Sequence, residues 1–107
     1  MTDVKAALAW CPFPDAASAR QAAATLLDEK LIACANILPG IESVFEWRGG
    51  VSSGTEVAVL FKTTSACLDA LTTRLAECHP YDTPAIIGWH CDAAHPGTLK
   101  WLGGQCQ

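Results

Sequence analysis

Residues 41–64, IESVFEWRGGVSSGTEVAVLFKTT, contain two extended segments separated by a pair of glycines. Residues 41–47 alternate between two sets of side chains in the manner of a strand, and residues 55–64 form a second, largely apolar strand. The glycines at 49 and 50 tolerate the positive φ angles that a two-residue hairpin turn requires. We therefore predict a β-hairpin with its turn at residues 48–51.

A strand, a helix and a further strand are predicted before this hairpin. Residues 4–11, VKAALAWC, form a short apolar run that is closed by the turn residues 12–14. Asp15 is a typical N-cap, and the Ala- and Leu-rich sequence after it predicts a helix to about Lys30. Residues 31–40, LIACANILPG, predict a strand whose Pro-Gly pair marks a bulge or an edge, because proline cannot donate to a ladder.

A second helix and a fourth strand are predicted after the hairpin. Ser65 is expected to cap a helix over residues 65–78, whose leucines recur at steps of three and four. Pro80 disfavours helical geometry in the residue before it, so the helix should stop there. Residues 83–91 predict a strand, and residues 96–102 predict one short helix.

The resulting order, β-α-β-β-α-β, is that of an α+β, ferredoxin-like fold built as a split βαβ unit. We expect one domain over residues 1–107, with both helices on one face of an antiparallel sheet. Residues 57–61 are apolar on both sides of their strand, which is typical of a strand that is covered on both faces. Charged residues make up only 17% of the chain against a usual value of about 25%, so we expect further copies of the chain to cover the second face.

Composition excludes several classes of partner. The net charge is −4 and there is no basic run, so we expect no nucleic-acid binding. No segment of 18 apolar residues and no secretory signal are visible, so we expect no membrane partner and a cytoplasmic location. The six cysteines include no CxxC pair and are interpreted as cytosolic thiols that are mostly buried.

Three motifs identify a resemblance. KLIACANILPGIESVFEWRG at 30–49, EVAVLFKTT at 56–64 and HPYDTP at 79–84 resemble, in order and spacing, the CutA divalent-cation tolerance proteins. The resemblance implies a homotrimer of ferredoxin-like subunits, a cytoplasmic protein and a role in tolerance to copper and other divalent metals. It also implies an architecture similar to that of the trimeric PII signalling proteins, which bind small ligands between subunits, and it gives no reason to expect an enzyme.

The resemblance also implies a copper site. It points to Cys11, to His79 and to the preceding position, which is Cys78 here and often histidine in relatives, while Ala85 replaces a usual glutamate. Two thiolates and one imidazole suit copper, with zinc or another divalent cation as the alternative. Two of these residues have a structural alternative, because Cys78 continues the apolar helix face and His79 suits a helix C-cap. Cys11 is the thiol expected to be most reachable, which favours a functional role.

Two other functions are considered. A PII-like ligand sensor would use Trp47, Arg48, Lys62 and Tyr81, an aromatic wall with cations that suits an anionic ligand. A Cys-His hydrolase would pair Cys11 with His79, but no orienting acid or oxyanion-hole motif accompanies them.

Overall fold

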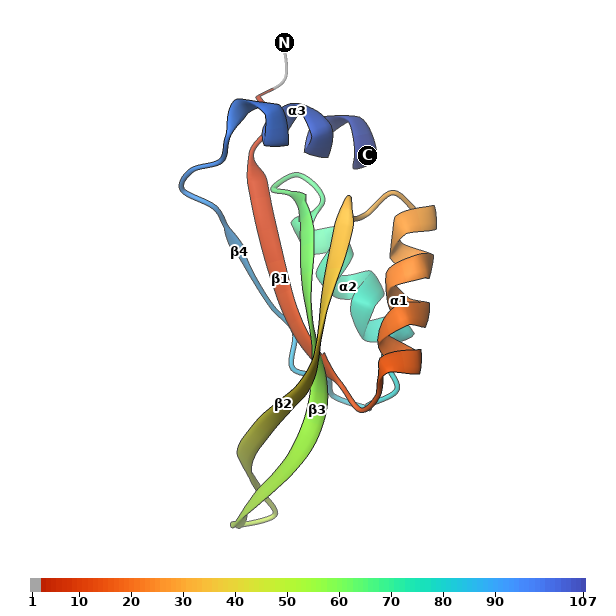
Figure 1. Cartoon of the computed structure of the whole chain (residues 1–107), viewed down its shortest axis with the longest axis vertical. Coiled ribbons are helices and arrows are strands. Elements are labelled where there is room, and N and C mark those ends of the chain that lie inside the picture. Colours follow the sequence, from red (N-terminus) through yellow and green to blue (C-terminus); the bar gives the residue numbers. More distant parts are fainter. Residues whose placement is uncertain (1–2) are drawn as a thin grey trace.

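A computed structural model describes residues 3–107 and confirms the ferredoxin-like arrangement (Figure 1). The elements, in chain order, are β1 (Ala6–Phe13), α1 (Ala16–Asp28), β2 (Cys34–Trp47), β3 (Gly50–Thr64), α2 (Leu68–Cys78), β4 (Ile87–His90) and α3 (Pro96–Gln105). One antiparallel sheet has the strand order β2-β3-β1-β4, so the two strands of the hairpin lie at one side and β1 pairs with both β3 and β4.

The interior lies between the sheet and the helices α1 and α2, which cover the same face (Figure 1). Every second residue of β1 is buried, from Ala7 through Phe13, while the residues between them are only partly buried. The predicted Asp15 cap of α1 is confirmed, because its carboxylate accepts a hydrogen bond of 2.7 Å from the N–H of Ser18. One face of α1 is buried, with Leu26 fully enclosed. The buried side chains that alternate along β1 and those that recur every three or four residues along α1 therefore pack together in one core.

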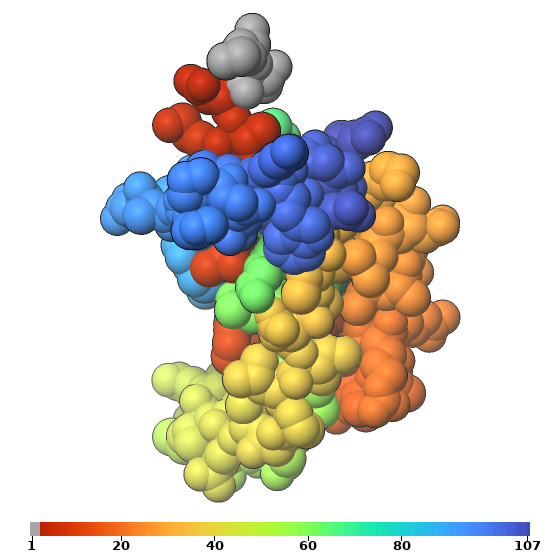
Figure 2. All heavy atoms as spheres, turned by 45° about the horizontal axis from the view of Figure 1, so that its top comes forward, coloured from red at the N-terminus to blue at the C-terminus, as the bar shows by residue number. Residues whose placement is uncertain are grey.

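The hairpin of β2 and β3 extends well beyond the body formed by the helices (Figures 1 and 2). Pairing continues from Cys34 opposite Lys62 out to Trp47 opposite Gly50. The predicted hairpin is confirmed, but its two central residues are Arg48 and Gly49, both with positive φ, and not the glycine pair. The third strand begins at Gly50 instead of residue 55, because cross-strand pairing holds the Val-Ser-Ser-Gly segment extended despite its weak strand propensity.

The predicted irregularity at Pro39-Gly40 is also confirmed. The register of β2 against β3 shifts between Leu38 and Ile41, and Gly40 has a φ of 76°. β2 is the edge strand, where a missing N–H costs no ladder bond. The bulge bends the strand at the point where the hairpin leaves the body.

Several predicted boundaries were wrong. β1 continues through Pro12 to Phe13, because pairing with Ala58 and Val57 of β3 holds those residues in the sheet. Ser65 is not the cap of α2: it lies in a turn, its hydroxyl donates to the carbonyl of Ala6, and the helix begins at Leu68.

The remaining boundaries differ by shorter stretches. α1 ends at Asp28, and β4 is limited to Ile87–His90 because only those residues pair with β1. α3 passes through Gly103 and Gly104 to Gln105, because Leu102 is buried and accepts a hydrogen bond from the N–H of Cys106.

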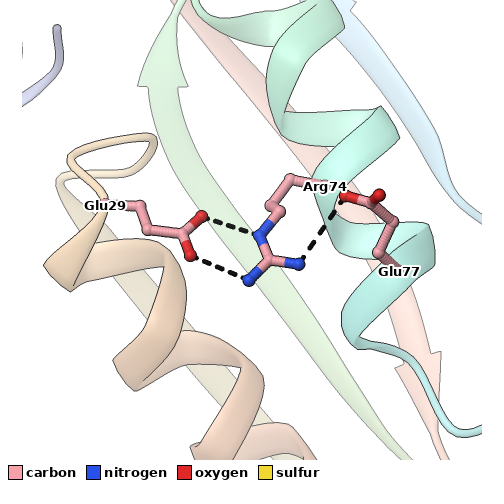
Figure 3. A network of polar contacts seen from close by, with 3 residues as sticks. All are labelled: Glu29, Arg74 and Glu77. Atoms are coloured by element: carbon pink, nitrogen blue, oxygen red, sulfur yellow. Dashed lines mark hydrogen bonds and ion pairs between the residues drawn. The ribbon is translucent and has the colours of Figure 1, made fainter.

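The two core helices are joined on their outer side by an ion-pair network (Figure 3). The guanidinium of Arg74 donates two hydrogen bonds of 2.8 Å to the carboxylate of Glu29 and lies 3.6 Å from Glu77. These hydrogen bonds lower the pKa of Glu29. The side chains are about one-third exposed or more, so solvent screening limits the contribution, and the network mainly fixes how α1 lies against α2.

We expect Gly49→Ala to lower the free energy of unfolding by about 1–2 kcal/mol, the usual cost of left-handed geometry for an L-residue. Gly49 has a φ of 79°, and nothing lies within 4 Å of where its Cβ would be, so the cost is conformational. Gly54→Ala is the matched control, because that position is equally open and lacks positive φ. Urea denaturation measures both variants, and an equal loss in the two would contradict the turn assignment.

Candidate functional site

An open groove lies between the hairpin and the segment that follows α2. Its volume is about 850 Å³. The lining is aromatic and oxygen-rich, with carboxylates as its only charged side chains. The groove residues are Pro12, Ser43, Phe45, Trp47, Ser52, Gly54, Thr55, Glu56, Tyr81, Asp82, Thr83 and Ala85.

His79 lies behind one wall of this groove. Its ring stacks on Phe13 with centroids 4.4 Å apart and contacts Tyr81 at 4.8 Å. Its Nδ1 accepts a hydrogen bond from the N–H of Tyr81, so its Nε2 carries the proton and donates to the carbonyl of Pro12 at 2.8 Å. His79 is the C-cap residue of α2, as the sequence suggested, but its ring is only 7% exposed and both ring nitrogens are already hydrogen-bonded.

Tyr81 connects the two walls of the groove. Its hydroxyl donates a hydrogen bond of 2.9 Å to the carboxylate of Glu56 on β3. Burial raises the pKa of Tyr81 to about 12, with further contributions from the hydrogen bond to Glu56 and the charge of that carboxylate. The phenol therefore remains a proton donor, and it holds Glu56 at the rim of the groove.

Cys11 is not reachable, contrary to the sequence prediction. It is fully buried because β1 continues past it and its side chain falls on the face that α1 and α2 cover. Burial, and to a lesser degree the charge of Glu56, raise the pKa of Cys11 to about 12. Its sulfur lies 3.6 Å from the carbonyl of Pro12, the same carbonyl that His79 contacts, so the thiol is protonated and is not activated as a hydrolase nucleophile would be.

Cys78 lies at the end of α2 and packs against the core in the way its helical spacing indicates. It also lies beside Gln21, Thr25 and Arg74 in a shallow hollow on the outer side of the helices. Between residues 3 and 107, no three His, Cys, Asp or Glu side chains are grouped so that they could hold a metal ion. The set Cys11, Cys78 and His79 is therefore not assembled in the single chain.

Of the four residues predicted for a ligand cleft, two line the groove and two lie outside it. Trp47 and Tyr81 line the groove. Arg48 lies at the hairpin turn, with its guanidinium 5.7 Å from the centre of the Trp47 ring. Lys62 lies near the end of β3, opposite Cys34, and is outside the groove lining.

Sequence reasoning missed Glu56 and Asp82, the two carboxylates of the groove. Both stand in the quoted motifs, Glu56 at the start of EVAVLF and Asp82 within HPYDTP. The available signal was a carboxylate beside otherwise apolar strand residues, but only the folded chain brings the two segments to one groove.

Comparison with known proteins gives a consistent result. The family model described as "CutA1 divalent ion tolerance protein" matches residues 7–105. The "Divalent-cation tolerance protein CutA" of Pectobacterium atrosepticum is 37% identical over 92 residues, which cover 86% of this chain and 84% of that protein. The chain belongs to the CutA1 divalent ion tolerance family.

Structural comparison and eukaryotic relatives extend this assignment. The crystal structure of CutA1 from Oryza sativa superposes with a TM-score of 0.93 at 34% identity, covering 100% of this chain and 98% of that one. The curated rice protein named "Protein CutA 1, chloroplastic" is 36% identical over 101 residues, which cover 94% of this chain. This chain spans about half to two thirds of the length of the frog and plant CutA relatives.

We expect Cys11 to resist alkylation by iodoacetamide at pH 8 in the folded protein. A pKa of about 12 instead of 9.0 lowers the thiolate fraction about a thousandfold, and burial blocks access as well. Mass spectrometry of the labelled peptides checks this, with half-exposed Cys34 as an internal control and urea-unfolded protein as the reference for full reactivity. Labelling of Cys11 at the rate of Cys34 would contradict its burial.

Proposed function

We propose that this CutA1-family protein contributes to divalent-cation tolerance by binding copper at the groove, with zinc or another divalent cation as the alternative ion. One observation carries the proposal: among residues 3–107, Glu56 and Asp82 are the only charged side chains that line the groove. Two carboxylates, with no lysine or arginine among the lining residues, attract a cation and disfavour an anion.

The groove supplies oxygen donors that suit a divalent ion. Carboxylate and hydroxyl oxygens can be ligands of Cu²⁺, which accepts oxygen as well as nitrogen. Glu56 is held by the phenol of Tyr81, so a bound ion would share this carboxylate with that hydrogen bond. Two carboxylates per chain do not complete a coordination shell, which leaves positions for water or for ligands from a neighbouring chain.

The ligands implied by the family resemblance form a second version of the copper site. Cys11, Cys78 and His79 would have to converge, and His79 would have to release Pro12 or Tyr81 to free a ring nitrogen. The two versions are adjacent, because Pro12 and Tyr81 form the groove wall that separates His79 from the groove. Substitutions therefore distinguish them.

We also propose that the protein is a homotrimer. The face of the sheet opposite α1 and α2, together with the hairpin, carries large apolar side chains in water, among them Trp47 at 63% and Ile87 at 65% exposure. Patches of this kind on soluble proteins are usually interfaces.

A cytoplasmic location is part of the same proposal. All six cysteines are free, which suits a reducing compartment. No helix within residues 3–107 has the length and apolar character needed to cross a membrane. Recovery of the protein in a membrane or periplasmic fraction would refute the assignment.

A PII-like ligand sensor is the second candidate, because Phe45, Trp47 and Tyr81 give the groove an aromatic wall. The anionic ligand expected for this role finds no cation in the lining, since Arg48 and Lys62 lie outside it. Stabilisation by a nucleotide but not by Cu²⁺ in a thermal-shift assay would favour the sensor.

We expect the double variant Glu56→Gln/Asp82→Asn to weaken Cu²⁺ binding by more than about tenfold, measured by isothermal titration calorimetry, because it removes both groove charges. Asp28→Asn, on the outer side of α1, is the matched control and should bind as the unmodified protein does. If Cys11→Ser/His79→Ala loses copper instead, the thiol and imidazole version is correct. Unchanged affinity in both double variants would refute both versions.

We expect sedimentation equilibrium to give three times the 11.3 kDa chain mass. Ile87→Glu should weaken this assembly, because it places a charge on the exposed sheet face, whereas Leu27→Glu on the outer side of α1 should not. A folded species with the mass of one chain at micromolar concentration would contradict the trimer.

A further inference from the structure

The aromatic side chains of the groove have no part in the copper site proposed above. Copper would take oxygen ligands there, whereas Phe45, Trp47 and Tyr81 present ring surface to the same groove. These three side chains are between 40% and 63% exposed. A hollow that combines aromatic side chains with a few polar groups is typical of a site for a small organic molecule.

The groove residues of the hairpin occupy one of its two faces, because successive side chains of a strand point to opposite faces. The pairing register orders them along that face. Glu56 lies opposite Ile41, Phe45 lies opposite Ser52 farther out, and Trp47 lies opposite Gly50 beside the turn. The face therefore leads from a carboxylate near the body of the molecule to two aromatic rings near the tip of the hairpin (Figure 1).

Both carboxylates of the groove lie at its inner end. The hydroxyl of Tyr81 donates to Oε2 of Glu56 at 2.9 Å, and Asp82 follows Tyr81 directly in the chain. Between this end and Phe45 the lining includes Gly54, which lacks a side chain. Apart from its chain neighbours, nothing in residues 3–107 lies within 4 Å of where a Cβ of Gly54 would be. An open strip therefore joins the acidic end of the groove to its aromatic end.

The turn end of the groove carries the opposite charge. The guanidinium of Arg48 lies 5.7 Å from the centre of the Trp47 ring, outside the groove lining. A ligand cation is attracted to the inner end and repelled at the turn end, where ring surface is available for an apolar group. A ligand that suits both ends has one positive group and an apolar body, and an anion or a chain of several cations does not.

We propose that the groove binds a small primary amine with an aromatic body. The ammonium group would donate charge-assisted hydrogen bonds to Asp82 and to Oε1 of Glu56, the oxygen that Tyr81 leaves free. Its aromatic body would pack against Phe45 and Trp47 in offset or edge-to-face contact. The site overlaps the proposed copper site but does not rest on copper binding, because the ring contacts need no metal.

The first test compares ligands and needs no variant. Isothermal titration calorimetry of the assembled protein uses tryptamine, indole-3-propionate, which has the same body with an anionic end, and spermidine, which has several cations and no ring. We expect tryptamine to bind more than about tenfold more tightly than either of the others, because only it matches both ends of the groove. Equal affinity for indole-3-propionate or for spermidine, or no binding of tryptamine, would overturn the proposal.

The second test locates the ligand. We expect Phe45→Leu and Trp47→Leu each to weaken tryptamine binding by about three- to tenfold through the loss of ring contacts, and to leave Cu²⁺ binding unchanged. Val44→Ala, an exposed position on the other face of the hairpin, is the matched control and should alter neither. Unchanged tryptamine affinity in both leucine variants would overturn the assignment.

The copper and amine proposals fail separately. The double variant Glu56→Gln/Asp82→Asn should weaken both ligands, since each depends on the groove carboxylates. Tryptamine binding without Cu²⁺ binding in the unmodified protein would refute the copper proposal alone. Cu²⁺ binding without tryptamine binding would refute the amine proposal alone.

Discussion

The strand β1 is the constraint on which both the core and the candidate site depend. It pairs with β3 on one side and with β4 on the other, so both neighbouring strands fix which of its side chains point to each face of the sheet. That alternation places Cys11 and Phe13 under the helices and leaves the carbonyl of Pro12 to accept the hydrogen bond of His79. A slip of one residue would turn Cys11 outward and remove the stacking partner of His79.

The hairpin adds the second part of the site. Because β3 continues for fifteen residues, Glu56 falls where the strand leaves the cover of the helices, with Tyr81 of the next segment within hydrogen-bonding distance. The groove is therefore made from two segments that are well separated in sequence, and one hydrogen bond joins its walls. Its aromatic side chains are exposed in the single chain, which suits a surface that is completed by another copy.

Local chemistry in the sequence predicted much of this fold. Asp15 as a cap, the helix end before Pro80 and the bulge at Pro39-Gly40 each follow from the residue itself and its neighbours. The errors arose where tertiary contacts override local preference: residues 50–54 are extended only because β2 pairs with them, and Ser65 bonds to β1 instead of capping a helix. The burial of Cys11 was missed for the same reason. Pro12 suggested that the strand ends at Cys11, but pairing with β3 extends the strand by two residues, to Phe13.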